Sequence, residues 1–129
     1  MDVISDMLTR IRNAYRSGQK TTLVPHSQLR HKLALLFIKY GYLKKLETSE
    51  IGKNKKMIQI WLKYTNGEPA VTKIRRISKS GQRIYSDSER LKRIGGNRGM
   101  IVVSTSKGLL PHWEAKKQKL GGEVICVVF

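Results

Sequence analysis

Residues 56–64 read KMIQIWLKY. From Ile58 onward every second residue, including Ile60 and Leu62, is apolar or aromatic, and this alternation is the period of a half-buried β-strand. Residues 42–48 read as a second strand, and a short basic loop joins the two. The stretch therefore predicts an antiparallel hairpin, around which the first part of the chain is organised.

Two helices are expected before this hairpin. Apolar residues recur at helical spacing from Val3 to Tyr15, and again over residues 27–40, where Gly41 supplies a C-terminal stop. A short strand at 21–24 lies between the two helical patterns. The order helix, strand, helix, strand, strand predicts an αβαββ lobe.

A break in the chain follows the hairpin, marked by the turn residues Asn66, Gly67 and Pro69. We therefore expect an N-terminal lobe over residues 1–67 and a C-terminal lobe over residues 68–129. The expected elements of the second lobe are strands at 70–78, 82–85, 100–104 and 123–129, a helical turn at 86–93, a loop at 95–99 and a short helix at 112–120. The predicted fold class is α+β with two small lobes, N-terminal αβαββ and C-terminal β-rich with a short helix.

The chain is basic along its whole length. Its 129 residues carry a formal net charge of +17, with 13 basic and 4 acidic residues up to Tyr64 and 13 and 5 beyond it. At 40% hydrophobic residues, the chain can bury a core, so the charge belongs to a folded surface and not to a disordered tail. A compact body with this charge works beside a polyanion, and nucleic acid is favoured over a membrane.

Membrane insertion and secretion are not indicated. No apolar run approaches the roughly 18 residues of a membrane span, and residues 1–6 show no signal or transit pattern. The single Cys126 cannot form an internal disulfide and suits a reducing compartment. A membrane-surface binder would need one strongly amphipathic basic helix, whereas the charge here is spread over strands and loops as well.

Enzymatic chemistry finds little support in the sequence. Residues 104–107, Ser-Thr-Ser-Lys, fit the S-x-x-K pattern of serine–lysine acyl enzymes, but the companion motifs are missing. A nucleic-acid-processing enzyme would need an acidic cluster for magnesium or a histidine–acid pair. The histidines, His26, His31 and His112, are too few and too scattered for a metal site. We expect no catalysis, no cofactor, no metal and no small-molecule substrate.

Residues 104–107 read better as a nucleic-acid contact. Three hydroxyls, one ammonium and open backbone N–H groups after a strand suit phosphate oxygens and the ribose 2′-hydroxyl; the alternative is a polar turn. Tyr85 can stack on a base or sugar, or it can be a packed tyrosine. Glu123 can pair with Lys107, accept from a base or hydroxyl donor, or be a simple surface acid.

Four blocks of the sequence are similar to one known family. They are residues 6–13 (DMLTRIRN), 83–85 (RIY), 102–108 (VVSTSKG) and 121–126 (GGEVIC). In this order they resemble bacterial-type small-subunit ribosomal protein eight over nearly the whole chain, and the S-T-S-K-G and G-G-E blocks together are specific. The resemblance implies a two-lobe, non-enzymatic protein. Such a protein is a primary binder of the central domain of small-subunit ribosomal RNA, supports assembly and translation, and meets neighbouring small-subunit proteins.

The resemblance also implies which residues bind RNA. The main contact maps onto the S-T-S-K-G loop and further contacts onto the other three blocks, to which we add two lysines of the basic hairpin loop. The predicted RNA-binding residues are Ser104, Thr105, Ser106, Lys107, Gly108, Gly121, Gly122, Glu123, Arg83, Tyr85, Thr9, Arg10, Arg12, Asn13, Lys55 and Lys56.

Three stretches depart from the family pattern. Residues 110–116, LPHWEAK, stand where a T-D-R-E-A-R-like helix start is usual. Residues 77–82, ISKSGQ, lack the proline that usually precedes the glycine, and residues 127–129, VVF, replace the usual aromatic finish. Such drift favours an organelle-encoded relative, with the mitochondrial matrix preferred over a bacterial cytoplasm or a plastid.

Overall fold

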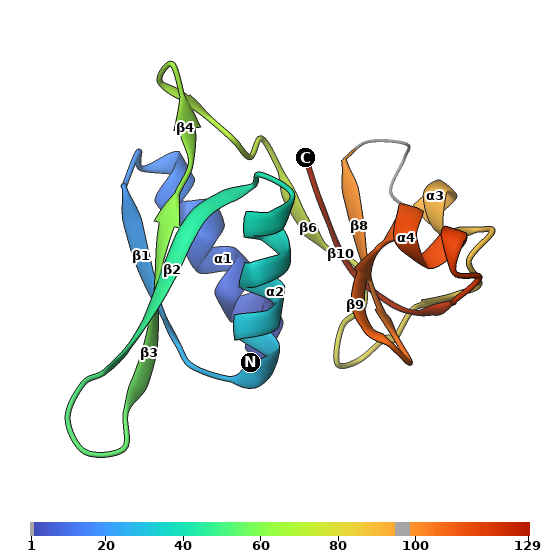
Figure 1. The fold of residues 1–129 in the computed structure, drawn as a ribbon, viewed down its shortest axis with the longest axis horizontal. Coiled ribbons are helices and arrows are strands. Elements are labelled where there is room, and N and C mark those ends of the chain that lie inside the picture. Colours follow the sequence, from blue (N-terminus) through green and yellow to red (C-terminus); the bar gives the residue numbers. More distant parts are fainter. Residues whose placement is uncertain (1, 95–98) are drawn as a thin grey trace. The chain divides into compact units, whose positions relative to one another are not determined.

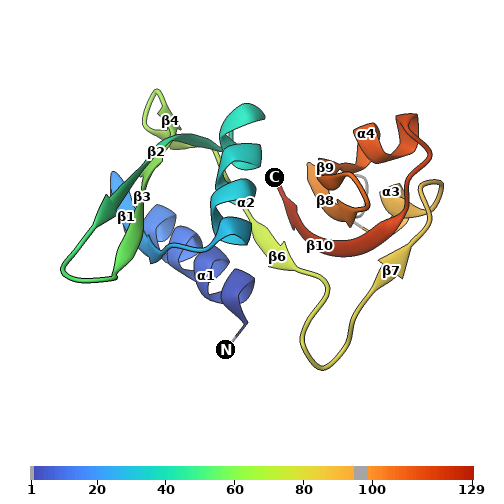
Figure 2. The same ribbon diagram turned by 60° about the horizontal axis from the view of Figure 1, so that its bottom comes forward.

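The computed structural model describes residues 2–94 and 99–129. The chain divides into two compact units, Met1–Thr72 and Lys73–Phe129, drawn as ribbons in Figures 1 and 2. The boundary lies a few residues beyond the Gly67 at which the turn residues suggested it. The α+β class is confirmed. The loop expected at 95–99 lies outside the described residues except for Gly99.

The first unit is a three-stranded antiparallel sheet, with two helices on one of its faces (Figure 1). The strand order is β1-β3-β2, which makes the strand of KMIQIWLKY the central one. The elements of this unit are α1 (Val3–Arg16), β1 (Thr21–Pro25), α2 (Gln28–Lys39), β2 (Leu43–Glu50), β3 (Lys56–Leu62), and a small hairpin of β4 (Tyr64–Thr65) and β5 (Glu68–Pro69).

A buried arginine joins three parts of the first unit. Arg30, in the first turn of α2, donates from Nε to the Val3 carbonyl at 3.0 Å and from Nη1 to the Pro25 carbonyl at 3.0 Å. Its Nη2 lies 3.4 Å from Asp6 Oδ2. The guanidinium therefore connects the start of α1, the end of β1 and the start of α2 around an apolar core. That core includes Met7, Leu8, Ile11, Leu33, Phe37, Ile58 and Ile60.

The expected strand 56–64 ends early, at Leu62. The cause is a tertiary hydrogen bond: the Lys63 N–H donates to the Tyr15 hydroxyl at 3.1 Å, and that hydroxyl donates to the Tyr42 carbonyl at 2.6 Å. The chain then enters the separate β4–β5 hairpin. The alternating pattern of the sequence assigns the Lys63 N–H to the sheet. In the structure this N–H bonds instead to Tyr15, near the C-terminal end of α1.

The second unit is built around its last strand. The sheet order is β6-β10-β8-β9, and β7 also pairs with β10; all pairings are antiparallel. The elements are β6 (Ile74–Arg76), β7 (Tyr85–Ser86), α3 (Leu91–Ile94), β8 (Met100–Thr105), β9 (Gly108–Pro111), α4 (His112–Lys117) and β10 (Gly122–Val128). Because β10 pairs with three other strands, it is the element on which the rest of this unit depends.

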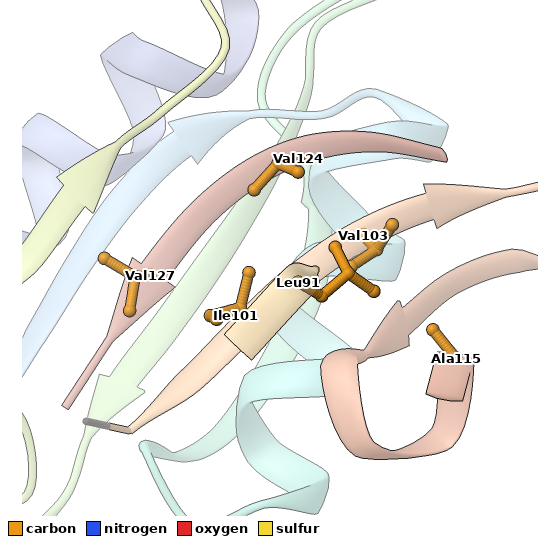
Figure 3. Close-up of a cluster of buried hydrophobic side chains, with 6 residues drawn as sticks. All are labelled: Leu91, Ile101, Val103, Ala115, Val124 and Val127. Atoms are coloured by element: carbon orange, nitrogen blue, oxygen red, sulfur yellow. The ribbon is translucent and has the colours of Figure 1, made fainter. Parts of the chain in front are cut away.

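The core of the second unit lies between this sheet and the short helices α3 and α4. Six side chains from β8, β10 and the two helices form one buried cluster (Figure 3). Its members are Leu91, Ile101, Val103, Ala115, Val124 and Val127. The cluster fixes the position of β8 and β10, whose ends carry the residues considered below.

Three expectations for the second unit are corrected. The strand expected at 70–78 is reduced to Ile74–Arg76, although the backbone N–H groups of Ile77 and Ser78 still donate to β10. The helical turn expected at 86–93 forms at Leu91–Ile94. Gly108–Pro111 is a strand where a connection was expected, because it pairs with β8 through a tight turn.

The only cysteine is inert in the folded state. Cys126 lies in β10 with no exposed surface, and burial raises the pKa of its thiol to about 12. A thiol reagent therefore reaches Cys126 only when the second unit opens, which makes its labelling a measure of that opening.

His112, the first residue of α4, acts as a hydrogen-bond acceptor in the second unit. Its Nδ1 accepts the Ile101 N–H at 3.1 Å. Burial, and after it the charge of Lys92, hold the pKa of His112 below its usual value. In the neutral ring the proton then sits on Nε2.

We expect the free energy of unfolding of the second unit to fall as the pH drops below about 6.5. Because the folded state has the lower pKa, the unfolded chain takes up the proton first, and protonating Nδ1 removes the acceptor of the Ile101 N–H. Urea titrations near neutral pH and at mildly acidic pH, followed by Trp113 emission in a Trp61→Phe background, measure the effect. His112→Asn offers a side-chain acceptor that does not titrate, so an undiminished pH dependence in this variant would contradict the assignment.

Within the described residues, no helix is long and apolar enough to cross a membrane.

Candidate nucleic-acid interface

Three of the four sequence blocks meet in one row across the second sheet. Glu123 of β10 is the register partner of Tyr85 in β7 on one side and of Ser104 in β8 on the other. Directly opposed residues in antiparallel strands point to the same face, with their Cβ atoms about 5 Å apart. The topology therefore brings the R-I-Y, S-T-S-K-G and G-G-E blocks together on one surface.

The S-T-S-K-G block forms the turn between β8 and β9. Thr105 pairs with Gly108, so Ser106 and Lys107 are the two residues of the turn, and both are exposed. The Thr105 hydroxyl donates to the Gly108 carbonyl at 2.8 Å and accepts the Lys107 N–H at 3.1 Å. Gly108 has a φ of +99°, which favours glycine. Thr105 and Gly108 therefore shape the turn that presents Ser106 and Lys107 to solvent.

Glu123 holds two other segments in place. Its Oε2 accepts the Ser78 hydroxyl at 2.6 Å and Arg83 Nη1 at 3.0 Å. The Ser78 hydroxyl is fully buried and in turn accepts the Ile84 N–H at 3.0 Å. The ion-pair partner of Glu123 is thus Arg83, and not the Lys107 that was considered from the sequence.

These contacts keep Glu123 ionised. Burial acts to raise the pKa of this carboxyl, but the hydrogen bonds from Ser78 and Arg83 and the charges of Arg83 and Arg76 outweigh it, so the pKa lies below its usual value. A carboxylate in so basic a surface would repel phosphate if it stood alone. Paired with Arg83, it fixes the position of a guanidinium whose side chain is half exposed.

Tyr85 is exposed, and the alternative of a packed tyrosine is wrong. It has 70% of its surface in solvent. Its neighbour Ile84 is held on both sides, because the Ile84 N–H donates to Ser78 and the Ile84 carbonyl accepts the Val124 N–H at 2.9 Å. A rigid backbone therefore presents an open aromatic ring beside Glu123, and such a ring suits stacking on a base or sugar.

The glycine pair has a steric role. A Cβ on Gly122 would lie 2.0 Å from the Ser104 carbonyl oxygen, and one on Gly121 would lie 2.5 Å from the Ser86 carbonyl oxygen. Both obstacles are backbone atoms of neighbouring segments. Gly121 and Gly122, predicted as RNA contacts, are thus required for β10 to approach β7 and β8 closely.

The first-helix block lies in the other unit. Thr9, Arg12 and Asn13 share one face of α1, since they are three and four residues apart, and Thr9 and Asn13 are exposed. Arg10 is used within the unit: Nε lies 3.1 Å from Asp6 Oδ2, and Nη1 donates to the Leu23 carbonyl at 2.9 Å. Its guanidinium therefore links α1 to β1.

Lys55 and Lys56 are exposed where the β2–β3 hairpin turns back. The turn closes with the Ile51 N–H donating to the Lys55 carbonyl at 2.7 Å, and Asn54 adopts a positive φ of 66°. The two side chains therefore project from an ordered hairpin end, which suits contacts with phosphate.

Ser78 is the residue of this surface that sequence reasoning missed. It lies between Ile77 and Lys79, just before a Ser-Gly turn, and reads as part of that turn, yet it is 0% exposed and hydrogen-bonded to Glu123. The one sequence signal for such a buried partner was Glu123 itself, an unexpected acid beside the glycine pair of so basic a chain.

The geometry does not favour the catalytic alternative. Ser104 lies within strand β8 and Lys107 lies in the turn after that strand, whereas the S-x-x-K arrangement needs both residues on one helical turn. In the part of the chain that the structure describes, no three His, Cys, Asp or Glu side chains are grouped as metal ligands.

Comparison with known proteins gives consistent matches over the whole chain. The family model for ribosomal protein S8 matches residues 2–129. Small ribosomal subunit protein uS8 of Nautilia profundicola is 43% identical over 129 residues, covering 99% of this chain and 98% of that protein. The proteins of the same name from Deinococcus deserti (45% over 130 residues, 99% and 98% covered) and Caldanaerobacter subterraneus (42% over 129 residues, 99% and 97% covered) are similar to the same extent.

Proposed function

The chain belongs to the ribosomal protein S8 family, and on that premise we propose that it is a structural, RNA-binding component of the small ribosomal subunit. It docks on the central domain of the small-subunit ribosomal RNA, supports assembly of that domain and thereby translation, and performs no catalytic turnover. Similar proteins bear the name of small-subunit proteins, which supports neighbouring small-subunit proteins as further partners.

The observation that carries this proposal is the row of Tyr85, Glu123 and Ser104 with the exposed turn beside it. Lys107 and Arg83 neutralise phosphates, and the Ser106 hydroxyl bonds a phosphate oxygen or a ribose 2′-hydroxyl in a distorted minor groove. Tyr85 stacks on a base or sugar. Because the hydrogen bonds around Glu123 hold the row rigid, it reads the shape of the RNA with little ordering on binding.

The other predicted residues divide into two groups. Thr105, Gly108, Gly121, Gly122 and Glu123 position the turn and the strands that carry the contact residues. Thr9, Arg12, Asn13, Lys55 and Lys56 add phosphate contacts from the first unit, which contribute affinity and salt dependence more than specificity. Arg10 belongs to the first group because its guanidinium bonds within the unit.

The compartment stays a prediction. The departures from the family pattern favour an organelle, with the mitochondrial matrix as first choice. The similar proteins described above come from bacteria and do not support that preference.

We expect Ser106→Ala and Lys107→Ala each to weaken specific RNA binding more than Lys53→Ala does. Lys53 lies in the basic hairpin loop and is exposed, so its loss removes charge alone and lowers binding to every RNA alike. Filter-binding titrations against a hairpin of the central-domain helix and a scrambled hairpin, each at two salt concentrations, measure the difference.

Wild-type protein should bind the native hairpin at least tenfold more tightly than the scrambled one, about 1.4 kcal/mol. Equal binding to both hairpins, lost together at high salt, would mean that only the net charge acts. Equal effects of all three substitutions would remove the turn as the specific reader while leaving a general affinity for RNA.

A further inference from the structure

A shallow hollow lies between α3 and α4 on the second unit. We call it the α3–α4 hollow; its lining includes Ser88, Leu91, Lys92, His112, Trp113 and Lys116. Its volume is about 190 Å³, whereas small-molecule sites begin at about 300 Å³. The hollow therefore suits one planar group and not a cofactor.

The hollow combines an aromatic wall with cations. Trp113 is 41% exposed, and Leu91, another lining residue, is buried in the core cluster. The His112 ring lies edge-on to the Trp113 ring, with centroids 5.0 Å apart, so two rings restrict each other's orientation. Lys92 and Lys116 are exposed at its rim.

The polar groups of the hollow are mostly hydrogen-bond donors. His112 Nδ1 is occupied by the Ile101 N–H, so the neutral ring offers Nε2–H as a donor. Lys92 is close enough for its charge to act on His112. Two ammonium groups, an imidazole N–H and the Ser88 hydroxyl suit an anionic partner, and among the described lining residues Glu89 is the one carboxylate.

We propose that the α3–α4 hollow binds one unpaired nucleotide of an RNA strand, with its base against Trp113 and its phosphate between Lys92 and Lys116. A nucleotide fits better than an acidic peptide, because its base offers a flat face to Trp113 and an amino group that Glu89 can accept from, whereas an acidic side chain offers neither. The proposal rests on the proposed function in that RNA is the partner. It adds a single-stranded contact in residues 110–116, where this chain departs from the family pattern.

The test uses the full chain with Trp61→Phe, so that all tryptophan emission comes from Trp113. The probe is an unstructured RNA hexamer of alternating adenosine and cytidine, and its control is an abasic hexamer with the same phosphates. We expect the hexamer to quench Trp113 and to bind roughly fivefold to a hundredfold more tightly than the abasic strand, as one stacked base provides.

Matched variants separate stacking from charge. Trp113→Leu should remove most of the advantage of the hexamer over the abasic strand, measured by filter binding, and Trp113→Phe should keep most of it. Lys92→Ala should weaken both strands more than Lys44→Ala, which removes an exposed lysine of the first unit. Equal quenching by both strands, or displacement of the hexamer by an acidic peptide at equal charge, would overturn the proposal.

The hairpin titration keeps this result separate from the proposed function. Trp113→Leu should bind the central-domain hairpin as wild type does. If the wild-type protein did not bind the hairpin specifically, the proposed function would be contradicted. If it bound the hairpin but the hexamer did not quench Trp113, only the proposal for the α3–α4 hollow would be contradicted.

Discussion

Gly122→Ala is expected to destabilise the second unit by about 3 kcal/mol, at the upper end of what overpacking costs. The added methyl group would lie 2.0 Å from the Ser104 carbonyl oxygen and 2.9 Å from the Ser104 carbonyl carbon. Both atoms belong to backbone that is hydrogen-bonded in the sheet and cannot rotate away as a side chain can. β8 and β10 must therefore separate where Ser104 faces Glu123.

The same substitution should reduce specific RNA binding in the molecules that remain folded, because β8 leads directly into the turn that carries Ser106 and Lys107. Urea titrations and the rate of Cys126 labelling measure the loss of stability. The matched control is Gly81→Ala, since a Cβ at Gly81 meets nothing within 4 Å and this variant should be neutral or slightly stabilising. A Gly122→Ala protein as stable as the Gly81→Ala control would show that the two strands can move apart at little cost.

Arg30→Met is expected to destabilise the first unit by about 3 kcal/mol. The side chain of Arg30 is only 11% exposed, and methionine fills a similar length without donating a hydrogen bond. The substitution leaves the Val3 and Pro25 carbonyls without this donor. Asp6 keeps Arg10 as an ion-pair partner. The expected loss of stability is therefore at the lower end of the roughly 3–5 kcal/mol that breaking a buried ion pair costs.

Arg16→Met is the matched control, because Arg16 is exposed at the end of α1 and its loss should change stability by well under 1 kcal/mol. Arg30→Lys should fall between the two, since lysine keeps the charge but lacks the planar fork of donors. Chemical denaturation followed by Trp61 emission in a Trp113→Phe background compares the three. If Arg30→Met unfolded at the same urea concentration as Arg16→Met, the three hydrogen bonds would not be holding the unit together.

The helices and the central hairpin could be predicted because their information is local. Apolar residues at helical spacing from Ile4 to Ile11 point into the core, and alternation around Ile58 and Ile60 marks the two faces of β3. The ends of elements depend on distant partners. β3 stops at Leu62 because the Tyr15 hydroxyl takes the next N–H, and that competition has no signature near residue 63.

The candidate site could be predicted only in pieces. Sequence blocks pointed to Tyr85, Glu123 and the turn at 104–108, but their meeting in one row depends on the order of the strands. The steric role of Gly122 was hidden for the same reason, since its obstacle is the backbone of another strand. Ser78 reads locally as a turn residue, and only the folded sheet gives it Glu123 as a partner.

The position of β10 has a consequence for how the protein is made. β10 is the strand to which β6, β7 and β8 pair, yet the ribosome that synthesises the chain adds it after all of them. A nascent chain that has reached Pro111 already carries Tyr85 and the Ser106–Lys107 turn, but it has neither the strand that aligns them nor the carboxylate that holds Arg83. The row of Tyr85, Glu123 and Ser104 therefore forms only after residues 122–128 have been translated, when β10 can pair with β6, β7 and β8. The partly made protein therefore cannot present the proposed RNA-binding row before the sheet is complete.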